Sequence, residues 1–428
     1  MSYFFFFIVF QIFLYINTIL LLIGIFYLVV FGLIPFFLPN KKNAPVNNSE
    51  LVSIIIPVYN DGFILEKHLE KLLKLDYPNY EILIVYSEKS TDRTEEIALK
   101  YAQNYNNVRA LPERISKGHA LNIGIDNAKA EYLLFLDSDS LVLNGFIEEA
   151  LSYFADKDMV LVNGCPIGLN ATQNLTTQLS WSVTNFISYV GVGSNRLFKH
   201  VGFQGFGGIW RKSALIECGK FREDTSTEDS ELNIRINRKY SKWKGVFGAN
   251  LYCYYYYPTD FTTFYLQLKR WNLGNLSYMG SVIKGIFQIS GVGARQKFIY
   301  LSQFLMTFLF PIITYFSLGM SVVQFFLNFF YPNLSFGGGL FFLLIGLVSM
   351  VITFITMFLF TYPKYRRNSK VKLSKKYIFV GIFGIIYVIG LVFGIASLNS
   401  FKDMITKRHS IEVFYKVDKT KVQLSTIS

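Results

Sequence analysis

An apolar run of strand length ends at two carboxylates in Tyr132-Leu133-Leu134-Phe135-Leu136-Asp137-Ser138-Asp139-Ser140. Because this run does not alternate with polar residues, it predicts a central parallel strand that is buried on both faces. Open α/β sheets bind ligands at the carboxyl ends of such strands. Two neighbouring carboxylates repel each other unless a cation lies between them, and Mg²⁺ is commonly bound by one or two carboxylates, water and phosphates. Asp137 and Asp139 therefore predict a metal–diphosphate site; the alternative is a plain strand end that caps a helix beginning near Gly145.

Strands and helices alternate in the chain around this stretch. Buried strands are predicted at 52–57 and 80–86, and helices at 63–75 and 94–105. Such alternation is typical of a doubly wound sheet whose strands are mostly parallel. We therefore predict an α/β domain over about residues 51–258.

Charged residues are absent from three long blocks of the 428-residue chain, at 1–40, 298–362 and 377–401. Each block is longer than the ~20 apolar residues that cross a bilayer as a helix. The sequence therefore predicts an α-helical transmembrane region in two parts, an N-terminal anchor at 1–40 and three or four helices at 297–401. The first block is long enough for one tilted span or for two.

Basic residues cluster beside these blocks, and the formal net charge is +13. Lys41-Lys42 and the segment 364–376 favour a cytoplasmic position for the α/β domain and contact with anionic lipids. Three C-terminal spans would leave the basic tail at 402–428 on the opposite side, so their number stays open. We predict an integral, multi-pass protein of the cell membrane that binds membrane lipids and no nucleic acid.

Polar residues also follow the two strands that are predicted earlier in the chain. Tyr59 comes after the first strand, where it can stack on a nucleobase or lie in an ordinary turn. Glu88 follows the second strand, where it can accept a hydrogen bond from a ribose or uracil. Lys117 opens a predicted helix, a position at which anionic ligands dock.

A different pattern occupies residues 259–296, which are neither a core segment nor a clean membrane span. Phe264, Leu268 and Trp271 lie near one helical face, whereas Lys269 lies off it. This pattern is typical of amphipathic helices that lie in the plane of a membrane.

The motifs, taken in chain order, resemble those of the family 2 glycosyltransferases of the GT-A fold, over about Leu51–Trp271. More narrowly, the chain resembles the membrane-embedded processive group that contains cellulose, hyaluronan and poly-N-acetylglucosamine synthases. The matching motifs are I-P-V-Y-N at 56–60, S-T-D-R-T at 90–94, K-G-H-A-L-N at 117–122, D-S-D at 137–139, G-F-G-G-I-W-R at 205–211, T-E-D at 227–229 and Q-L-K-R-W at 267–271.

The resemblance implies a site for a nucleotide-diphosphate sugar, with a UDP-sugar as the expected donor. Asp139, together with Asp137, is implied to bind Mg²⁺ or Mn²⁺. The family usually carries two aspartates where this chain has Ser87-Glu88, a departure that bears on the donor's base. The implied donor-binding residues are Tyr59, Glu88, Lys117, Asp137, Gln267 and Arg270.

The resemblance also implies that Asp229 is the general base and that Glu228 belongs to the catalytic motif. A sugar hydroxyl is a poor nucleophile and must lose its proton as it attacks the anomeric carbon, so a positioned carboxylate is required. A single displacement inverts the anomeric configuration. The alternative for this motif is that Thr227 caps a helix whose first turn is acidic.

The implied acceptor-binding residues are Thr227, Gly207, Gly208 and Trp271. Trp271 offers a flat apolar face to a sugar ring; alternatively it anchors the chain at a membrane surface. The glycines allow the backbone to approach the acceptor, or form a plain turn.

The resemblance implies a membrane-bound inverting glycosyltransferase that elongates a polysaccharide and exports it through its own spans. One alternative is a non-processive enzyme that adds one sugar to a lipid or lipid-linked acceptor. Another is a membrane transporter or channel whose α/β domain only senses a ligand. Whether an accessory membrane subunit takes part stays open. The enzyme interpretation requires Asp137, Asp139, Asp229 and Arg270 to converge.

Overall fold

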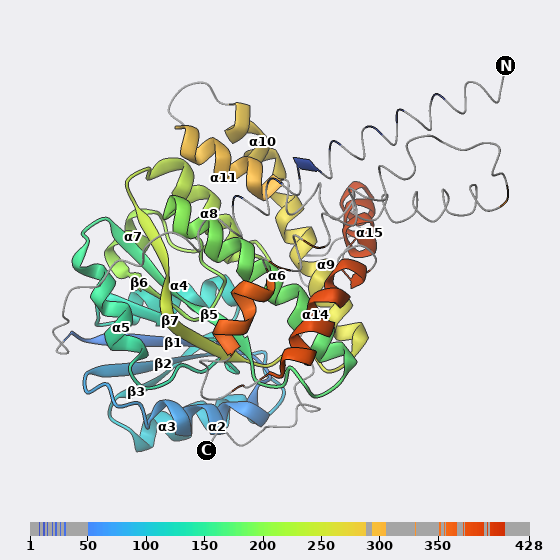
Figure 1. Cartoon of the computed structure of the whole chain (residues 1–428). Coiled ribbons are helices and arrows are strands. Elements are labelled where there is room, and N and C mark those ends of the chain that lie inside the picture. Colours follow the sequence, from blue (N-terminus) through green and yellow to red (C-terminus); the bar gives the residue numbers. More distant parts are fainter. Residues whose placement is uncertain are drawn as a thin grey trace.

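A mixed, mostly parallel β-sheet forms the centre of the molecule in the computed structural model (Figure 1). The structure describes residues 50–287, 293–304, 357–365, 373–388 and 394–406, together with isolated residues elsewhere. In these residues the sheet has seven strands in the order β3-β2-β1-β4-β6-β5-β7. The strands are β1 (Val52–Val58), β2 (Tyr80–Ser87), β3 (Val108–Glu113), β4 (Tyr132–Phe135), β5 (Met159–Gly168), β6 (Gly208–Arg211) and β7 (Lys244–Tyr255).

Strand β6 runs antiparallel to both of its neighbours, β4 and β5, whereas the other strand pairs are parallel. The predicted α/β class with a mostly parallel sheet is therefore confirmed, and β6 makes the sheet mixed. The chain passes from β1 through β2 to β3 and then returns to place β4 on the other side of β1. The carboxyl ends of β1 and β4 consequently meet at a topological switch point, where open α/β sheets bind ligands.

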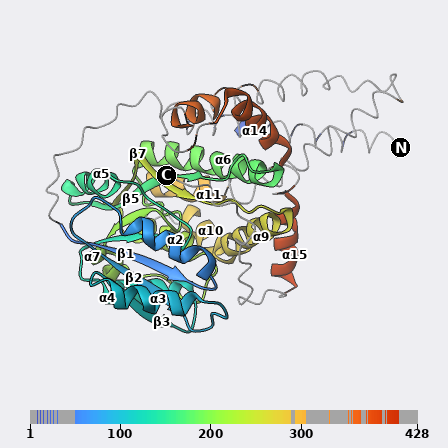
Figure 2. The same ribbon diagram turned by 90° about the horizontal axis from the view of Figure 1, so that it is seen from below.

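Helices cover both faces of the sheet (Figure 2). Ile54 and Ile56 of β1 pack in one buried cluster with the helices at 62–72, 94–104, 146–152 and 175–198. Ile55 packs in a second cluster with the helices at 117–127, 212–217 and 228–239. Because alternate residues of a strand point to opposite faces, both faces must be apolar here. Full burial of each isoleucine stabilises the fold by roughly 1.5–3 kcal/mol.

The described helices surround the sheet and extend beyond it. Before β7 they are α2 (Gly62–Leu72), α3 (Thr94–Asn104), α4 (Lys117–Asn127), α5 (Phe146–Ser152), the short 3-10 helix η3 (Tyr153–Ala155), α6 (Leu175–Phe198), α7 (Lys212–Glu217) and α8 (Glu228–Lys239). After β7 they are α9 (Phe261–Ser277), α10 (Met279–Phe287), α11 (Ala294–Phe304), α14 (Lys375–Val388) and α15 (Gly394–Ile405).

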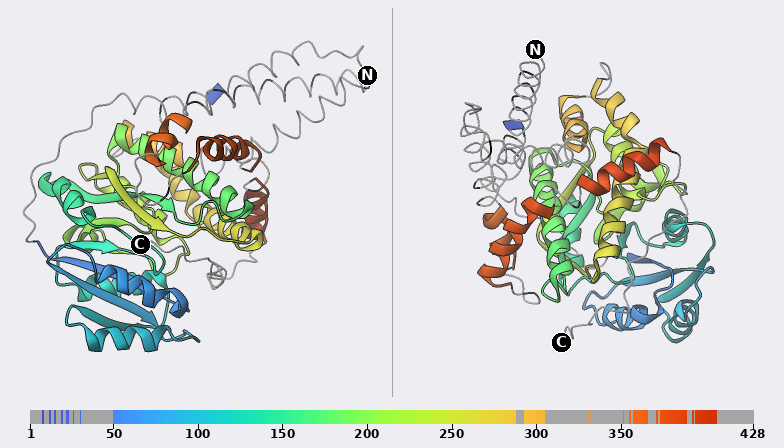
Figure 3. Two further views of the ribbon diagram at one scale, coloured as in Figure 1. Left: turned by 60° about the horizontal axis from the view of Figure 1, so that its bottom comes forward. Right: turned by 90° about the vertical axis from the view of Figure 1, so that its right-hand side faces the viewer.

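The last two described helices pack against earlier parts of the chain (Figure 3). Helix α14 lies on α6, where Ser182 Oγ donates a hydrogen bond of 2.9 Å to the Gly381 carbonyl. Helix α15 lies along α9, with an ion pair of 2.5 Å between Lys269 and Asp403. Asn399 of α15 also donates a hydrogen bond of 2.6 Å to Tyr265 Oη of α9. Segments that are more than 100 residues apart therefore support α6 and α9.

Among the helices that the structure describes, none combines the length and apolar character needed to cross a membrane. Most of the predicted anchor at 1–40, the predicted tail at 402–428 beyond residue 406, and most of the predicted spans at 297–401 lie outside the described residues. The segment predicted as amphipathic, 259–296, contains α9 and α10 and the start of α11.

Candidate active site

The two aspartates that follow β4 lie in a tight turn at the switch point. The Asp137 N–H donates to Ser140 Oγ at 2.9 Å, and the Ser140 N–H donates to the Asp137 carbonyl at 2.9 Å. His68, a buried residue of α2, donates from Nδ1 to the Ser138 carbonyl at 2.6 Å. The turn is thus held from within and from the neighbouring helix. His68 lies 69 positions before Asp137 in the chain, and no sequence motif links the two.

The Asp139 charge acts on residues near the end of β7. Burial, followed by the Asp137 and Asp139 carboxylates, raises the pKa of Cys253 well above its usual range. Burial and the same Asp139 charge raise the pKa of Tyr256. The described residues contain no cluster of three or more His, Cys, Asp and Glu side chains that could hold a metal by themselves. Two hard carboxylates fit a Mg²⁺ or Mn²⁺ ion whose remaining ligands are water and phosphate oxygens.

Lys117 links this turn to the start of α8. Its Nζ lies 2.8 Å from Asp137 Oδ1 and 3.6 Å from Glu228 Oε1. Ser116 caps α4 by accepting a hydrogen bond from the His119 N–H, which places Lys117 at the first position of the helix. Although burial disfavours its charge, the Asp137 and Glu228 carboxylates raise the pKa of Lys117 above its usual value, so the side chain is cationic.

Asp229 lies in the first turn of α8 beside Glu228, which is buried. Burial and the Glu228 carboxylate raise the pKa of Asp229 to about 6, against the opposing charges of Lys117 and Arg270. An enclosed carboxyl that titrates near neutral pH is suited to accept a proton. Thr227 precedes the helix, but its side chain makes no capping hydrogen bond. Thr227 thus precedes a helix whose first turn is acidic, as the capping alternative predicts, but without the side-chain cap.

Arg270 of α9 reaches the same region. Its Nη1 donates to the Ser226 carbonyl at 3.0 Å, one residue before the T-E-D motif. A Cβ on Gly274, one turn further along α9, would lie 2.2 Å from Thr227 Oγ1, so helix and motif are closely packed. Trp271 packs partly buried in a cluster with Phe264. Gln267 is also partly buried on α9.

The glycine-rich segment before β6 approaches Asp229 at Gly205. Gly205 has a φ of +85°, and a Cβ on it would lie 3.3 Å from Asp229 Oδ2. Gly207 packs instead on β7, where an added Cβ would lie 2.5 Å from Cys253 Cβ. Gly208 is buried in β6 against Asn163. Of these glycines, Gly205 is the one that faces Asp229, and the G-F-G-G motif alone does not indicate which glycine this is.

Tyr59 and Glu88 follow β1 and β2, at the carboxyl ends of the strands, as Asp137 does after β4. Tyr59 is 40% exposed, and Glu88 forms an ion pair with the exposed Arg114. The S-T-D-R-T motif supports this end of the sheet: the Thr91 N–H donates to Asn60 Oδ1 at 2.7 Å. The structure thus places these two residues at the carboxyl ends of β1 and β2. It brings together one charged cluster, which consists of Lys117, Asp137, Glu228, Asp229 and Arg270.

Comparisons with known proteins show what the chain is similar to. Residues 53–219 match the model of the family described as glycosyl transferase family 2. Glucomannan 4-beta-mannosyltransferase 7 of Arabidopsis thaliana is 25% identical over 268 residues, covering 59% of this chain and 48% of the relative. Glycosyltransferase GlyG of Streptococcus pneumoniae is 38% identical over 118 residues, covering 27% of this chain and 39% of the relative. The chain spans about half the length of the curated relatives it matches.

Among solved structures, the chain is similar to mannosyltransferase PcManGT from Pyrobaculum calidifontis, which was solved in complex with GDP-Man and Mn²⁺. The TM-score is 0.57 at 16% identity, and the match covers 90% of this chain and 99% of the other. At this identity the similarity shows the fold. Residues 53–219 therefore resemble the family 2 glycosyl transferases, and the fold is similar to that of the mannosyltransferase, an α/β fold of the GT-A class.

Proposed function

We propose that the protein is a metal-dependent, inverting glycosyltransferase that moves a sugar from a nucleotide-diphosphate donor to a hydroxyl of a saccharide acceptor. The charged cluster carries this proposal, because Lys117 bridges Asp137 at the end of β4 and Glu228 at the start of α8. Cations for a diphosphate thus lie beside a carboxyl that can accept a proton, and sugar transfer needs both.

Asp229 is the proposed base. It removes the proton from the acceptor hydroxyl as the oxygen attacks the anomeric carbon, and the bond from that carbon to the diphosphate oxygen breaks. The nucleotide diphosphate leaves from the opposite side, so the configuration inverts. Glu228 holds Lys117 by its charge and raises the pKa of Asp229.

The leaving group is proposed to lie between Lys117, Arg270 and the aspartates of the β4 turn. Asp139 and Asp137 would hold Mg²⁺ or Mn²⁺, which when bound stabilises negative charge on the departing diphosphate. The Arg270 guanidinium has five N–H donors. One of them, on Nη1, binds the Ser226 carbonyl, and the others are proposed to bind the diphosphate. Gln267, one turn earlier on α9, is proposed to contact the same group.

The nucleoside is proposed to bind at the edge formed by the ends of β1 and β2, with Tyr59 stacked on the base and Glu88 accepting hydrogen bonds. The acceptor is proposed to approach from α9 and the glycine segment. Its proposed contacts are Trp271, Thr227, Gly207 and Gly208.

We further propose that the product is a polysaccharide, made by the protein in a cell membrane with its catalytic domain on the cytoplasmic side. Support comes from the long uncharged blocks of the sequence and from the relative named as a glucomannan 4-beta-mannosyltransferase. The experiment is to incubate the purified full chain in lipid with Mn²⁺ or Mg²⁺ and a panel of UDP- and GDP-sugars. Nucleotide release identifies the donor; long products support a synthase, and a product one sugar larger than its acceptor supports single addition.

The rate should fall as the pH drops through about 6. Transfer requires ionised Asp229, whose pKa burial and Glu228 raise to about 6. Protonation below that value removes the base, so the maximal rate should be half its plateau near pH 6. Glu228→Gln should lower the pKa of Asp229, because one neighbouring negative charge is removed while Lys117 and Arg270 stay. The acid limb of the pH–rate profile, where the rate falls with pH, should therefore move to lower pH. A limb that moves to higher pH in Glu228→Gln would contradict the assignment.

His68→Ala should weaken metal-dependent donor binding about tenfold, as is typical when a group that orients metal ligands is removed. His68 Nδ1 holds the Ser138 carbonyl between the two aspartates, so its loss frees the turn. The measurement is donor binding as a function of Mn²⁺ concentration. His68→Asn, which keeps an N–H donor near the position of Nδ1, should retain most of the affinity. Equal loss in both variants would count against the orienting bond.

A further inference from the structure

Ten residues without helix or strand lead from α7 into Glu228 and Asp229. This segment, Cys218–Thr227, is called the base loop below. The N–H groups of its first three residues, 218–220, donate to carbonyls of α7, but the rest of the loop is not part of a sheet or helix ladder that would hold its backbone groups. Its position therefore depends on side chains that reach it from other elements.

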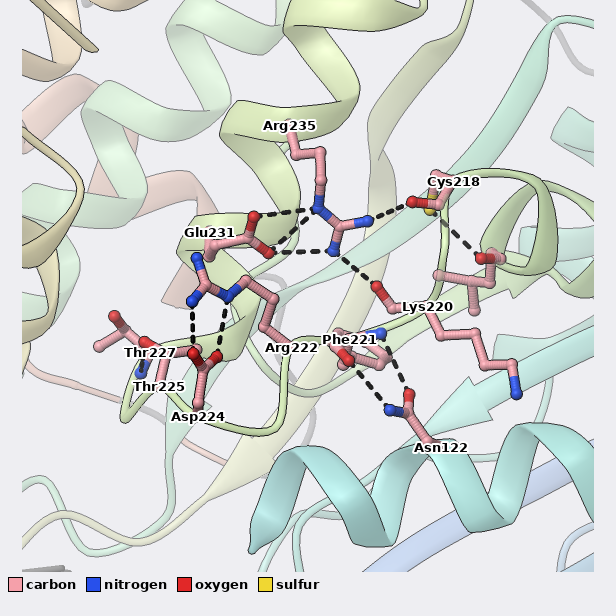
Figure 4. A network of polar contacts seen from close by, with 11 residues as sticks. Asn122, Cys218, Lys220, Phe221, Arg222, Asp224, Thr225, Thr227, Glu231 and Arg235 are labelled. Carbon is pink, nitrogen blue, oxygen red and sulfur yellow. Dashed lines mark hydrogen bonds and ion pairs between the residues drawn. The ribbon is translucent and has the colours of Figure 1, made fainter. Parts of the chain in front are cut away.

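Asn122 of α4 binds the middle of the base loop (Figure 4). Its Nδ2 donates to the Phe221 carbonyl at 2.9 Å, and its Oδ1 accepts from the Phe221 N–H at 3.0 Å. The same Nδ2 donates to Glu223 Oε1 at 2.8 Å. Asn122 is buried, and the Phe221 ring packs edge-on against Phe135 of β4. One amide thus satisfies both backbone groups of a buried loop residue.

Two positions at the start of the same helix also contact the base loop. Ser116 Oγ donates to the Glu223 carbonyl at 2.8 Å. A Cβ on Gly118 would lie 2.3 Å from the Arg222 carbonyl oxygen, so only glycine permits this approach. Lys117 lies between them in sequence and reaches Asp137 and Glu228. The start of α4 therefore contacts both the proposed donor site and the loop that carries the proposed base.

Arg235 of α8 holds the beginning of the base loop (Figure 4). Its Nη2 donates to the Lys220 carbonyl at 2.6 Å, and Nη1 donates to the Cys218 carbonyl. Glu231, one turn earlier on α8, accepts from Nε at 3.0 Å and from Nη2 at 2.9 Å. The guanidinium is thus oriented by a carboxylate and satisfies two loop carbonyls.

We propose that Asn122 is a positioning residue which, with Arg235, holds the base loop so that Asp229 faces the donor bound beside Lys117. This inference rests on the proposed function and adds the support on which the base depends. Neither residue contacts the reacting atoms. A displacement of the loop by about 1 Å is expected to cost up to about 100-fold in rate, because proton transfer depends on alignment.

The test compares Asn122→Ala with two matched controls in the full chain. Asn127→Ala removes an exposed asparagine of the same helix. Arg222→Gln removes an exposed ion pair within the base loop. We expect Asn122→Ala to lower the maximal rate about 30-fold or more, with donor affinity within threefold of wild type. Both controls should keep the wild-type rate.

The pH profile separates positioning from a structural role. A loosened loop admits water to Asp229 and reduces the burial that raises its pKa, so the acid limb of Asn122→Ala should move below pH 6. A loss of folded protein alone lowers the rate equally at every pH. If Asn122→Ala does not fold, Arg235→Lys is used, because it keeps a cation beside Glu231 but cannot bind both loop carbonyls.

The inference would be overturned if Asn122→Ala kept the wild-type rate per molecule that binds donor and the wild-type pH dependence. It would also be overturned if donor binding fell in parallel with the rate. Failure of the proposed function is distinct, since wild-type protein would then release no nucleotide from any donor in the panel.

Discussion

Asp229→Asn should lower sugar transfer about 10³-fold while leaving donor binding intact. The amide has nearly the shape of the carboxyl but cannot accept the acceptor's proton. Donor binding should persist because Lys117, Arg270 and the β4 turn remain in place, and one negative charge near the diphosphate is removed. Nucleotide release at saturating donor and acceptor, together with donor titration, measures the two effects separately.

A matched control exists in the base loop. Asp224→Asn makes the same chemical change at an exposed carboxylate that pairs with Arg222, and it should keep the wild-type rate. If Asp229→Asn turned over as fast as Asp224→Asn, Asp229 would not be the base. A large loss of donor affinity in Asp229→Asn would instead indicate a binding role.

Asp139→Asn should weaken metal-dependent donor binding about 100-fold, because a neutral amide oxygen is a much poorer ligand for Mg²⁺ or Mn²⁺ than a carboxylate. Asp139 is the sharper test of the pair, since Asp137 also neutralises Lys117. The affinity for a nucleotide-diphosphate sugar is measured with and without Mn²⁺. The two proteins should differ only when the metal is present.

Asp158→Asn is the control for this change. Asp158 is an exposed carboxylate just before β5, so it lies at the end of the strands opposite to Asp139. It should bind the donor like wild type at every Mn²⁺ concentration. Equal metal dependence in Asp139→Asn and wild type would remove Asp139 from the proposed metal site.

Local patterns in the chain were sufficient for much of the fold. The apolar runs at 52–57 and 80–86 coincide with β1 and β2, because a strand buried on both faces needs apolar side chains at successive positions. The run that ends at Asp137 likewise became β4, at the switch point. Such signals lie within a few residues of one another, so they can be interpreted without knowledge of the rest of the molecule.

The reversal of β6 and the partners of the site residues depend on distant parts of the chain. Asn122 and Phe221 are 99 positions apart, and His68 lies 70 positions before Ser138. Gly205, and not Gly207, faces Asp229, although both belong to one motif. Hydrogen bonds of this kind carry no periodicity, so nothing in the local sequence predicts them.

Residue order alone determined the strand and helix types, the carboxyl-end position of the aspartates and the chemical kinds of side chain available at the site. Packing of α4, α8 and α9 around the sheet decided which of them meet, and it set the raised pKa of Asp229. The physical reason is that propensity and burial patterns act over one or two turns of chain. Charge proximity and enclosure depend on distances that only the folded molecule defines.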